Sequence, residues 1–441
     1  MKPPTSSSRT PAHERECPDC GLFQTVPRMP WHAQADCIRC DSTLRRTRPN
    51  WFNRVLALQL TSLVLYVVAV TAPFLTATIV GSPRATTMLS LPLAFYAEGA
   101  WELGLIVLVT AILAPLAKIS VLLYVLLGLR TDDPPRSLPS IYRWYHRIGP
   151  WAMVEVFLLG VFVAFTRLGA IAKVDTGIAL YAVGGLMLAL VASDWLLDSE
   201  GVWEAMEARG LIQPNRPPDR TSKAGQPMAC HVCSRVNYEE AKHCTRCFSR
   251  LHRRLPNSAV HTWAMLAAAV LLYIPANVFP VMTIVRLGRG APSTILGGAQ
   301  ELLDAGMWPL AMLVFVASIM VPLFKLVALS FMLILTQRHS AWRLEDRTRI
   351  YRLVDFIGRW SMIDVFMLST LVGLVQSGVI ANINPGIGAI CFGSVVVLTM
   401  LAAACFDPRI MWDAAGENAT APASKIASKP TGRTLETALP A

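Results

Sequence analysis

The sequence predicts an all-α polytopic membrane protein: a tandem duplication of a four-helix transmembrane unit, each copy preceded by a small cytoplasmic zinc-ribbon (rubredoxin-like) domain. Three observations predict this architecture. The chain of 441 residues is 54% hydrophobic and 16% charged, with a mean hydropathy of +0.45, which is too apolar for a soluble protein. Its apolar residues gather in runs long enough to cross a bilayer. The same motifs also recur in both halves of the chain.

Residues 1–50 are expected to form an N-terminal tail and the first ribbon. Two CxxC motifs in this segment, sixteen residues apart, supply four thiols: Cys17, Cys20, Cys37 and Cys40. Four thiolates at such spacing can bind one tetrahedral metal ion. The segment has no short apolar core followed by a small-residue cleavage site, so we expect no secretory signal peptide and a cytoplasmic N-terminus.

Residues 51–200 are expected to form the first four-helix repeat. Its apolar segments run over about 54–79, 101–129, 150–167 and 178–197. A membrane helix needs about 20 apolar residues, and the third segment is near the lower limit. The sequence therefore predicts four crossings, which return the chain to the side on which it started.

A linker over 201–227 separates this repeat from a second ribbon over 228–256 and a second repeat over 257–408. The second ribbon carries two CxxC motifs ten residues apart: Cys230, Cys233, Cys244 and Cys247. Four further apolar segments follow at about 260–285, 305–336, 358–377 and 386–406. The polar tail over 409–441 shows no periodicity and is expected to be disordered.

Equivalent residues of the two halves keep a constant spacing. Lys118 and Lys325 are 207 positions apart, and both follow a Pro-Leu-x motif. After a two-residue insertion, Glu155 and Asp364 are 209 positions apart, in Trp-x-Met-x-acid-Val-Phe motifs. Because each half has an even number of crossings, the sequence predicts parallel rather than inverted repeats.

Positive charge gathers in alternate loops, which predicts the orientation in the membrane. The loops over 130–148 and 337–357 are rich in arginine, as are the segments carrying the ribbons, whereas the other loops hold few basic residues. By the positive-inside rule, ribbons, linker and both termini face the cytoplasm. The net charge of +11 is explained by this pattern, so we expect no nucleic-acid partner.

The eight paired cysteines are interpreted as two structural zinc sites, with iron in a rubredoxin-like site as an alternative. Four thiolates close the coordination sphere, so such a site stabilises a small domain and does not activate water. Thiol–disulfide chemistry is the competing interpretation. Redox CxxC motifs begin a helix in a βαβ context, which is missing here.

Lys118, Glu155, Lys325 and Asp364 are the candidate substrate or coupling residues. A charge inside an apolar helix is costly and is usually functional or paired. Because each lysine and the following acid lie at similar depths, a salt bridge between neighbouring helices is feasible. One hypothesis is a polar pocket near mid-membrane, and the other is a buried pair that only fixes helix register. Pro115 and Pro322 are expected to kink the lysine helices.

The combination of CxxC ribbons, PLxK and W-x-M-x-[DE]-V-F motifs resembles the paraquat-inducible protein A family of bacterial inner-membrane proteins, including its lipophilic-envelope-spanning branch. The resemblance implies a subunit that works with a periplasmic MCE-domain (mammalian cell entry) protein and moves phospholipid. It implies no enzyme activity, and no ATPase or hydrolase motif is present. The alternatives are a membrane thiol oxidoreductase and an exporter of redox-cycling toxicants.

Overall fold

A computed structural model describes residues 13–27, 29–79, 82–169, 173–212, 227–238, 241–286, 289–375 and 381–416. Within this described part, eight helical segments are long and apolar enough to cross a membrane. They are Trp51–Thr71, Trp101–Arg130, Leu138–Thr166, Ile178–Leu196, Ser258–Val278, Trp308–Gln337, Leu344–Leu374 and Ile387–Cys405. The prediction of eight membrane helices in two repeats is confirmed.

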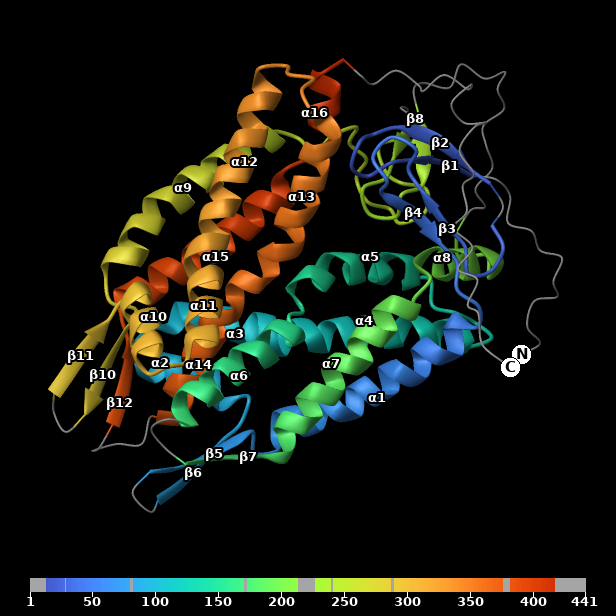
Figure 1. Cartoon of the computed structure of the whole chain (residues 1–441). Coiled ribbons are helices and arrows are strands. Elements are labelled where there is room, and N and C mark those ends of the chain that lie inside the picture. The colour runs from blue at the N-terminus through green and yellow to red at the C-terminus, as the bar shows by residue number, and fades with distance from the viewer. Residues whose placement is uncertain are drawn as a thin grey trace, which may run out of the picture.

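The molecule has two distinct ends, which we name the ribbon end and the sheet end (Figure 1). The ribbon end carries ribbon 1 (residues 13–46) and ribbon 2 (residues 227–251). Their strands are β1 (His13–Glu16), β2 (Phe23–Val26), β3 (Gln34–Asp36), β4 (Thr43–Arg46), β8 (Pro227–Ala229) and β9 (Val236–Tyr238). The sheet end is formed by the loops at the opposite end of the helices.

The first helix of each repeat is shorter than predicted. These helices are α1 (Trp51–Thr71) and α9 (Ser258–Val278), and each packs against the last helix of its own repeat, α7 (Ile178–Leu196) or α15 (Ile387–Cys405). A residue before proline is pushed into the extended region. Ala72 and Phe279, which precede Pro73 and Pro280, are indeed extended. These two prolines therefore end the helices rather than bend them.

Beyond the prolines, the chain adds two small antiparallel sheets that the sequence did not predict. β-branched residues such as Thr76, Thr78 and Ile79 favour strands over helix here. The strand orders are β6-β5-β7 in repeat 1 and β11-β10-β12 in repeat 2. The strands are β5 (Leu75–Ile79), β6 (Ser82–Thr86), β7 (Lys173–Thr176), β10 (Met282–Arg286), β11 (Arg289–Ser293) and β12 (Ala381–Pro385).

The lysine-bearing helices contain a π-helical turn immediately before the Pro-Leu-x-Lys motif. These turns are Leu108–Leu113 and Val316–Met320. Wider turns of this kind leave backbone groups to be satisfied by other partners. The Tyr66 hydroxyl donates to the Ile112 carbonyl at 3.0 Å, and Tyr273 donates to Ile319 at 3.2 Å. The flanking helices are α2 (Ser90–Ala97), α3 (Trp101–Val107), α4 (Ala114–Arg130), α10 (Ile295–Asp304), α11 (Trp308–Phe315) and α12 (Val321–Gln337).

The predicted arginine-rich loops are themselves largely helical. Each leads through a short 3₁₀ turn into the third membrane helix of its repeat. The helices are α5 (Leu138–Ile148), α6 (Val154–Gly169), α13 (Leu344–Gly358) and α14 (Ile363–Val375). α6 and α14 pack on each other and join the repeats, because Gly160 has no side chain to keep them apart: a Cβ there would lie 2.7 Å from the Phe366 Cβ.

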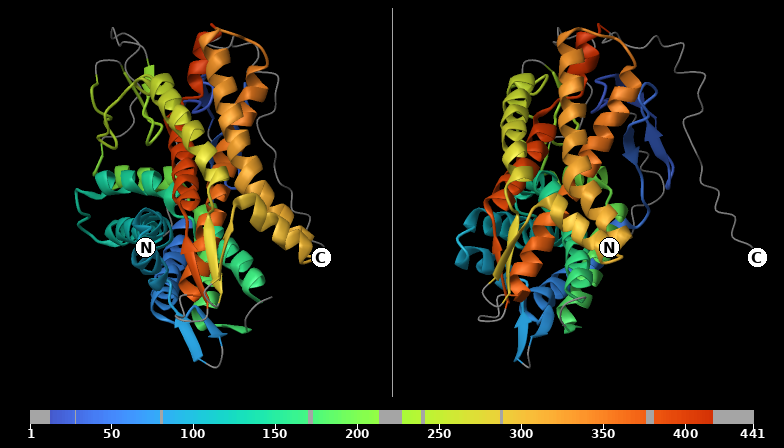
Figure 2. Two further views of the ribbon diagram at one scale, coloured as in Figure 1. Left: turned by 90° about the vertical axis from the view of Figure 1, so that its left-hand side faces the viewer. Right: turned by 60° about the vertical axis from the view of Figure 1, so that its left-hand side comes forward.

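Ribbon 2 packs on repeat 1, which precedes it in the chain, whereas ribbon 1 packs on repeat 2, near the other end of the described chain. The ribbon 1 cysteines share a hydrophobic cluster with α9, α12, α13 and Trp412, and those of ribbon 2 share one with α1, α4, α5 and Trp203. Figure 2 shows the blue strands of ribbon 1 beside the orange helices of repeat 2. Trp203 lies on α8 (Ser199–Ala208) and Trp412 on α16 (Arg409–Ala414).

α16 corrects the prediction of a disordered tail over 409–441, because its first residues are helical and buried against ribbon 1. Residues 417–441 of that tail, most of the 201–227 linker and residues 1–12 lie outside the described residues. Apolar side chains of α16, including Met411 and Trp412, are buried, which offsets the cost of ordering this short helix.

Buried ion pairs join the two ribbons to the helices. Arg15 of ribbon 1 and Arg246 of ribbon 2 both contact Glu200 of α8, at 3.0 and 3.1 Å. Burial acts to raise the pKa of Glu200, but these arginines hold that pKa below its usual range. Glu16 similarly contacts Arg254 and Arg409. Glu200 therefore stays ionised, and the ion pairs of both glutamates hold the ribbon end together.

Candidate functional site

The eight paired cysteines form two compact, buried clusters. In each cluster the four sulfur atoms lie within 4.8 Å of one another. The shortest Sγ–Sγ distances are 3.5 to 3.6 Å in ribbon 1 and 3.5 Å in ribbon 2. Metal–sulfur bonds of about 2.3 Å in a tetrahedron place the sulfurs about 3.8 Å apart. Both clusters could therefore hold a metal ion, as the sequence predicts for zinc.

The backbone shapes all four CxxC knuckles alike. In each knuckle the carbonyl of the first cysteine accepts a hydrogen bond from the N–H four residues later. That later residue has a positive φ of 56° to 71°, which closes the turn. The residues concerned are Gly21, Asp41, Ser234 and Phe248. The longer spacing in ribbon 1 is taken up by β2 and β3, so the uneven spacing leaves the geometry of its cluster unchanged.

Hydrogen bonds between the thiols polarise each cluster. They lower the pKa of the first cysteine of each CxxC pair and raise that of the second, as in Cys37 and Cys40. A closed set of four thiols with no βαβ context gives a metal a complete coordination sphere and leaves no open position for substrate. All ten cysteines lie in the described part of the chain and are free thiols.

Lys118 is paired, but with an acid that the sequence did not single out. Its Nζ lies 2.6 Å from Oδ2 of Asp194, near the end of α7. The Tyr145 hydroxyl donates to the other oxygen, Oδ1, at 2.8 Å. The pairing of Lys118 with Glu155 that the sequence made feasible is therefore wrong: the acid that reaches this lysine comes from α7, the fourth helix of the repeat.

Lys325 occupies the equivalent position in repeat 2 with a different neighbourhood. It is fully buried, and its Nζ donates a long hydrogen bond of 3.5 Å to the carbonyl of Gly358. The residues equivalent to Asp194 and Tyr145 are Ala403 and Val354. Among the described residues, no carboxylate lies within 4.0 Å of this lysine. Repeat 2 thus keeps a buried lysine without the acid that neutralises its counterpart.

The two acids of the W-x-M-x-[DE]-V-F motifs also differ. Glu155 reaches across the repeat interface, and its Oε1 lies 3.9 Å from Arg359 of repeat 2. Asp364 instead lines a cavity in repeat 2. Repeat 1 has Pro150 at the position equivalent to Arg359. The equivalent ion pair, from Asp364 to residue 150 of repeat 1, therefore cannot form.

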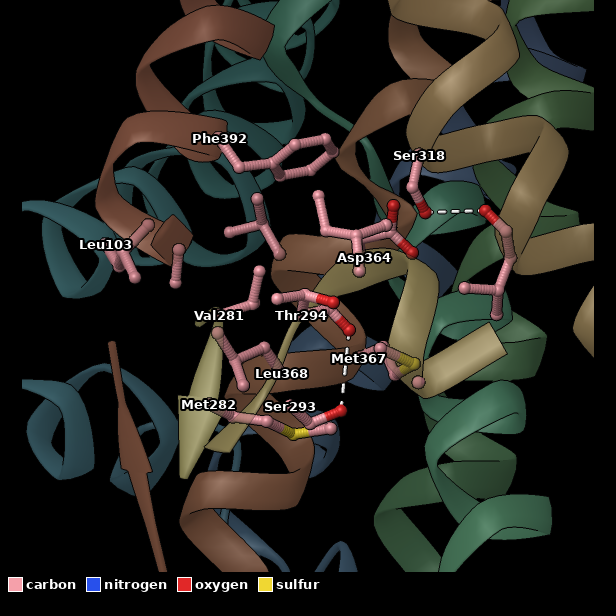
Figure 3. Close-up of a pocket in the computed structure, with 15 residues that line it drawn as sticks. Leu103, Val281, Met282, Ser293, Thr294, Ser318, Asp364, Met367, Leu368 and Phe392 are labelled. Atoms are coloured by element: carbon pink, nitrogen blue, oxygen red, sulfur yellow. Dashed lines mark hydrogen bonds between the residues drawn. The ribbon is translucent and has the colours of Figure 1, made fainter. Parts of the chain in front are cut away.

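A small cavity lies near the sheet end, lined by residues of repeat 2 and by Leu103 of repeat 1. Figure 3 shows the Asp364 carboxylate at this cavity, with Ser293, Thr294 and Ser318 around it. The Ser318 hydroxyl is engaged by the Val314 carbonyl. The rest of the lining is mainly apolar and includes Leu103, Val281, Met282, Val314, Leu368 and Phe392. Lys325 does not line the cavity, so the structure does not bring the predicted pair together there.

Sequence reasoning missed Asp194, Tyr145 and Arg359. Asp194 could have been found as the one acid in the apolar segment 178–197. Asp194 has no acidic equivalent in repeat 2, where Ala403 stands, so the motifs shared by the two repeats do not include it.

Comparison with known proteins matches most of the chain. The family model described as "Paraquat-inducible protein A" matches residues 52–207 and 260–416. The "Intermembrane transport protein PqiA" of Escherichia coli K12 is 32% identical over 398 residues, covering 90% of this chain and 95% of that protein. No solved structure matches the chain significantly.

Two further relatives carry names of the same kind. The "Lipophilic envelope-spanning tunnel protein A" of Escherichia coli K12 is 28% identical over 409 residues, covering 91% of each chain. The "Probable intermembrane transport protein" of Haemophilus influenzae is 25% identical over 429 residues, covering 93% of this chain and 98% of the relative.

Proposed function

Because the chain belongs to the paraquat-inducible protein A family, we propose that it is the inner-membrane subunit of an intermembrane lipid-transport system. Its named relatives are transport and envelope-spanning tunnel proteins, which supports transport rather than chemical catalysis. We also propose that its partner is a periplasmic MCE-domain protein that receives or delivers phospholipid, as the resemblance to the family implies.

The orientation proposed places the ribbon end in the cytoplasm. The arginines of α5 and α13, together with the ribbons, lie at that end, in accord with the positive-inside rule. The two sheets then face the periplasm, where a tunnel protein would meet them.

The observation that carries the proposal is the cavity beside Asp364. Its mainly apolar lining suits an acyl chain, whereas Asp364, Ser293 and Thr294 offer polar groups for a lipid headgroup. Its place between the repeats, near the sheet end, suits loading or unloading of phospholipid.

The two repeats are proposed to play different parts. In repeat 1, Asp194 forms an ion pair with Lys118 and accepts a hydrogen bond from Tyr145, and this fixed arrangement suits a scaffold. In repeat 2, the buried Lys325 and the cavity residue Asp364 are the candidates for coupling a change of charge to movement of lipid. Repeat 2 is therefore the proposed transporting half.

This proposal is tested by charge-removing variants in a strain deleted for this gene. Lys325→Ala and Asp364→Asn are expected to leave the envelope as sensitive to detergent as the deletion does, because the buried charges are lost. Glu155→Gln is the matched control in repeat 1, and it is expected to restore resistance, because its contact with Arg359 is long and partly exposed. Protein level in the membrane is measured for each variant.

Full restoration by both repeat 2 variants would disprove the role of the cavity and the lysine. Disappearance of both variants from the membrane would instead show that these residues are structural. Direct efflux of a redox-cycling compound by vesicles lacking any MCE protein would favour the exporter interpretation.

A further inference from the structure

One side chain of a membrane repeat touches the metal cluster of a ribbon. Arg352 lies on α13 of repeat 2, and its Nη2 donates to the backbone carbonyl of Cys40 at 2.7 Å and to its Sγ at 3.3 Å. The Nε of the same guanidinium lies 2.6 Å from Oδ2 of Asp19, inside the first CxxC motif. One arginine thus holds both knuckles of ribbon 1.

The other ribbon supports its sulfurs differently. In ribbon 2, the Ser249 hydroxyl lies 3.1 Å from the sulfur of Cys230 and 3.0 Å from that of Cys247. Asn237 also donates to Cys244 at 3.6 Å. These are residues of the ribbon itself. Arg143, the repeat 1 equivalent of Arg352, makes no hydrogen bond to ribbon 2 within the described ranges.

A positive donor beside a thiolate matters because of the charge of the cluster. Four thiolates and one divalent cation carry a net charge of about −2, which is costly to bury. A guanidinium hydrogen-bonded to one sulfur offsets part of that charge and fixes the ligand's orientation. Removal of such outer-sphere partners typically weakens metal binding by about 10- to 100-fold.

We propose that Arg352 is a positioning residue that makes metal binding by ribbon 1 depend on the docking of this ribbon against repeat 2. Ribbon 2, which supplies its own donors, binds its metal without such a requirement. Linkage is reciprocal: if docking strengthens metal binding, the bound metal strengthens docking by the same factor.

The helix that carries Arg352 also reaches Lys325. Gly358, whose carbonyl accepts the Lys325 hydrogen bond, is the last residue of α13, six positions after Arg352. Along a helix this is about 9 Å. A metal in ribbon 1 would therefore hold the helix that supplies the only acceptor found for Lys325 in the described residues. This inference does not depend on what the protein transports.

The test uses the full-length chain, purified in detergent and loaded with zinc. Zinc release to a coloured chelator is followed in time for wild type, Arg352→Ala, Arg352→Lys and Arg143→Ala. We expect two zinc ions per wild-type chain. In Arg352→Ala one of the two should be released about 10- to 100-fold more readily. Arg352→Lys keeps the positive charge but lacks the planar guanidinium that bonds Asp19 and Cys40 together. Its zinc release should therefore lie between those of wild type and Arg352→Ala. Arg143→Ala should release zinc as wild type does.

Hydrogen exchange of the same variants identifies the ribbon. In Arg352→Ala, exchange should rise over 13–46 and 344–358 and stay unchanged over 227–251. Zinc release from Arg352→Ala identical to wild type would overturn the proposal. Equal weakening of both zinc sites, or faster exchange in both ribbons, would also overturn it, because it would show general loss of folding rather than a role of Arg352 at one site.

Discussion

Lys118 and Lys325 occupy equivalent positions, and the residues opposite them decide what each can do. Asp194 accepts hydrogen bonds from Lys118 and Tyr145 with its two carboxylate oxygens. Ala403 stands at the equivalent place in repeat 2 and offers no charge. The lysines themselves and Asp364 could be found from the sequence, because a charge inside an apolar run is conspicuous. The partner of Lys118 could not, because helix proximity is a tertiary property.

Breaking the repeat 1 pair is expected to cost stability. Lys118→Ala leaves the Asp194 carboxylate without its charged donor, and hydrogen bonds to charged groups contribute about 1.5–3 kcal/mol. The thermal unfolding midpoint in detergent should therefore fall. Lys325→Ala removes no ion pair, so its midpoint should fall only by the smaller amount that follows from lost packing of the buried side chain.

The double variant Lys118→Ala/Asp194→Ala serves as the control for pairing. It should be less destabilised than the sum of the single variants, because the interaction can be lost only once. Strictly additive effects would show that the 2.6 Å contact contributes nothing to stability.

At the scale of helices and strands, apolar length predicted how many crossings there are, but not where each helix ends. Pro73 and Pro280 stop the first helices, and the following residues pair into sheets whose partners lie about a hundred positions away. Such long-range pairing leaves little local signal. The π-helical turns before Pro115 and Pro322 likewise depend on distant tyrosines to satisfy their carbonyls. Proline alone predicts a kink, which stays a prediction, whereas nothing in the local sequence predicts the π-helical turn.

The contact between α6 and α14 predicts a sensitive glycine. In Gly160→Ala, the new Cβ would meet the Phe366 Cβ at 2.7 Å and the Ile363 carbonyl at 2.9 Å, so the helices must separate. Overpacking of this kind costs about 1–3 kcal/mol. The unfolding midpoint in detergent should fall accordingly.

Gly184→Ala is the matched control, because a Cβ at Gly184 meets nothing within 4 Å on α7. It should leave the midpoint unchanged or raise it slightly, since alanine favours helix. An equal fall in both variants would argue that close approach at Gly160 does not join the repeats.

At the scale of the whole molecule, the spacing of the cysteines was enough to predict two metal-binding ribbons. It could not tell which repeat each ribbon packs on. That choice depends on Trp203 and Trp412, whose rings lie 5.6 and 5.1 Å from the guanidinium carbons of Arg246 and Arg39. The two contacts are made by equivalent residues of the two repeats. Trp203 and Arg246 come from consecutive segments of the chain, whereas Arg39 and Trp412 come from opposite ends of its described part.

Orientation in the membrane is testable by labelling. Asp175→Cys places an exposed thiol at the sheet end, and Ala341→Cys places one in the turn between α12 and α13 at the ribbon end. A membrane-impermeant maleimide applied to intact spheroplasts should label the first variant only. After lysis it should label both. Labelling of Ala341→Cys alone before lysis would reverse the proposed orientation, and the wild-type chain gives the background from its own cysteines.

Ribbon 2 packs on repeat 1 and ribbon 1 packs on repeat 2, which makes the molecule a closed ring of repeat, ribbon, repeat and ribbon. The polypeptide follows this ring once and is interrupted between α16 and β1, where Arg409 and Glu16 meet at 3.1 Å. Ribbon 1 is therefore joined covalently to repeat 1 while it packs on repeat 2, and it ties the first half of the chain to the second.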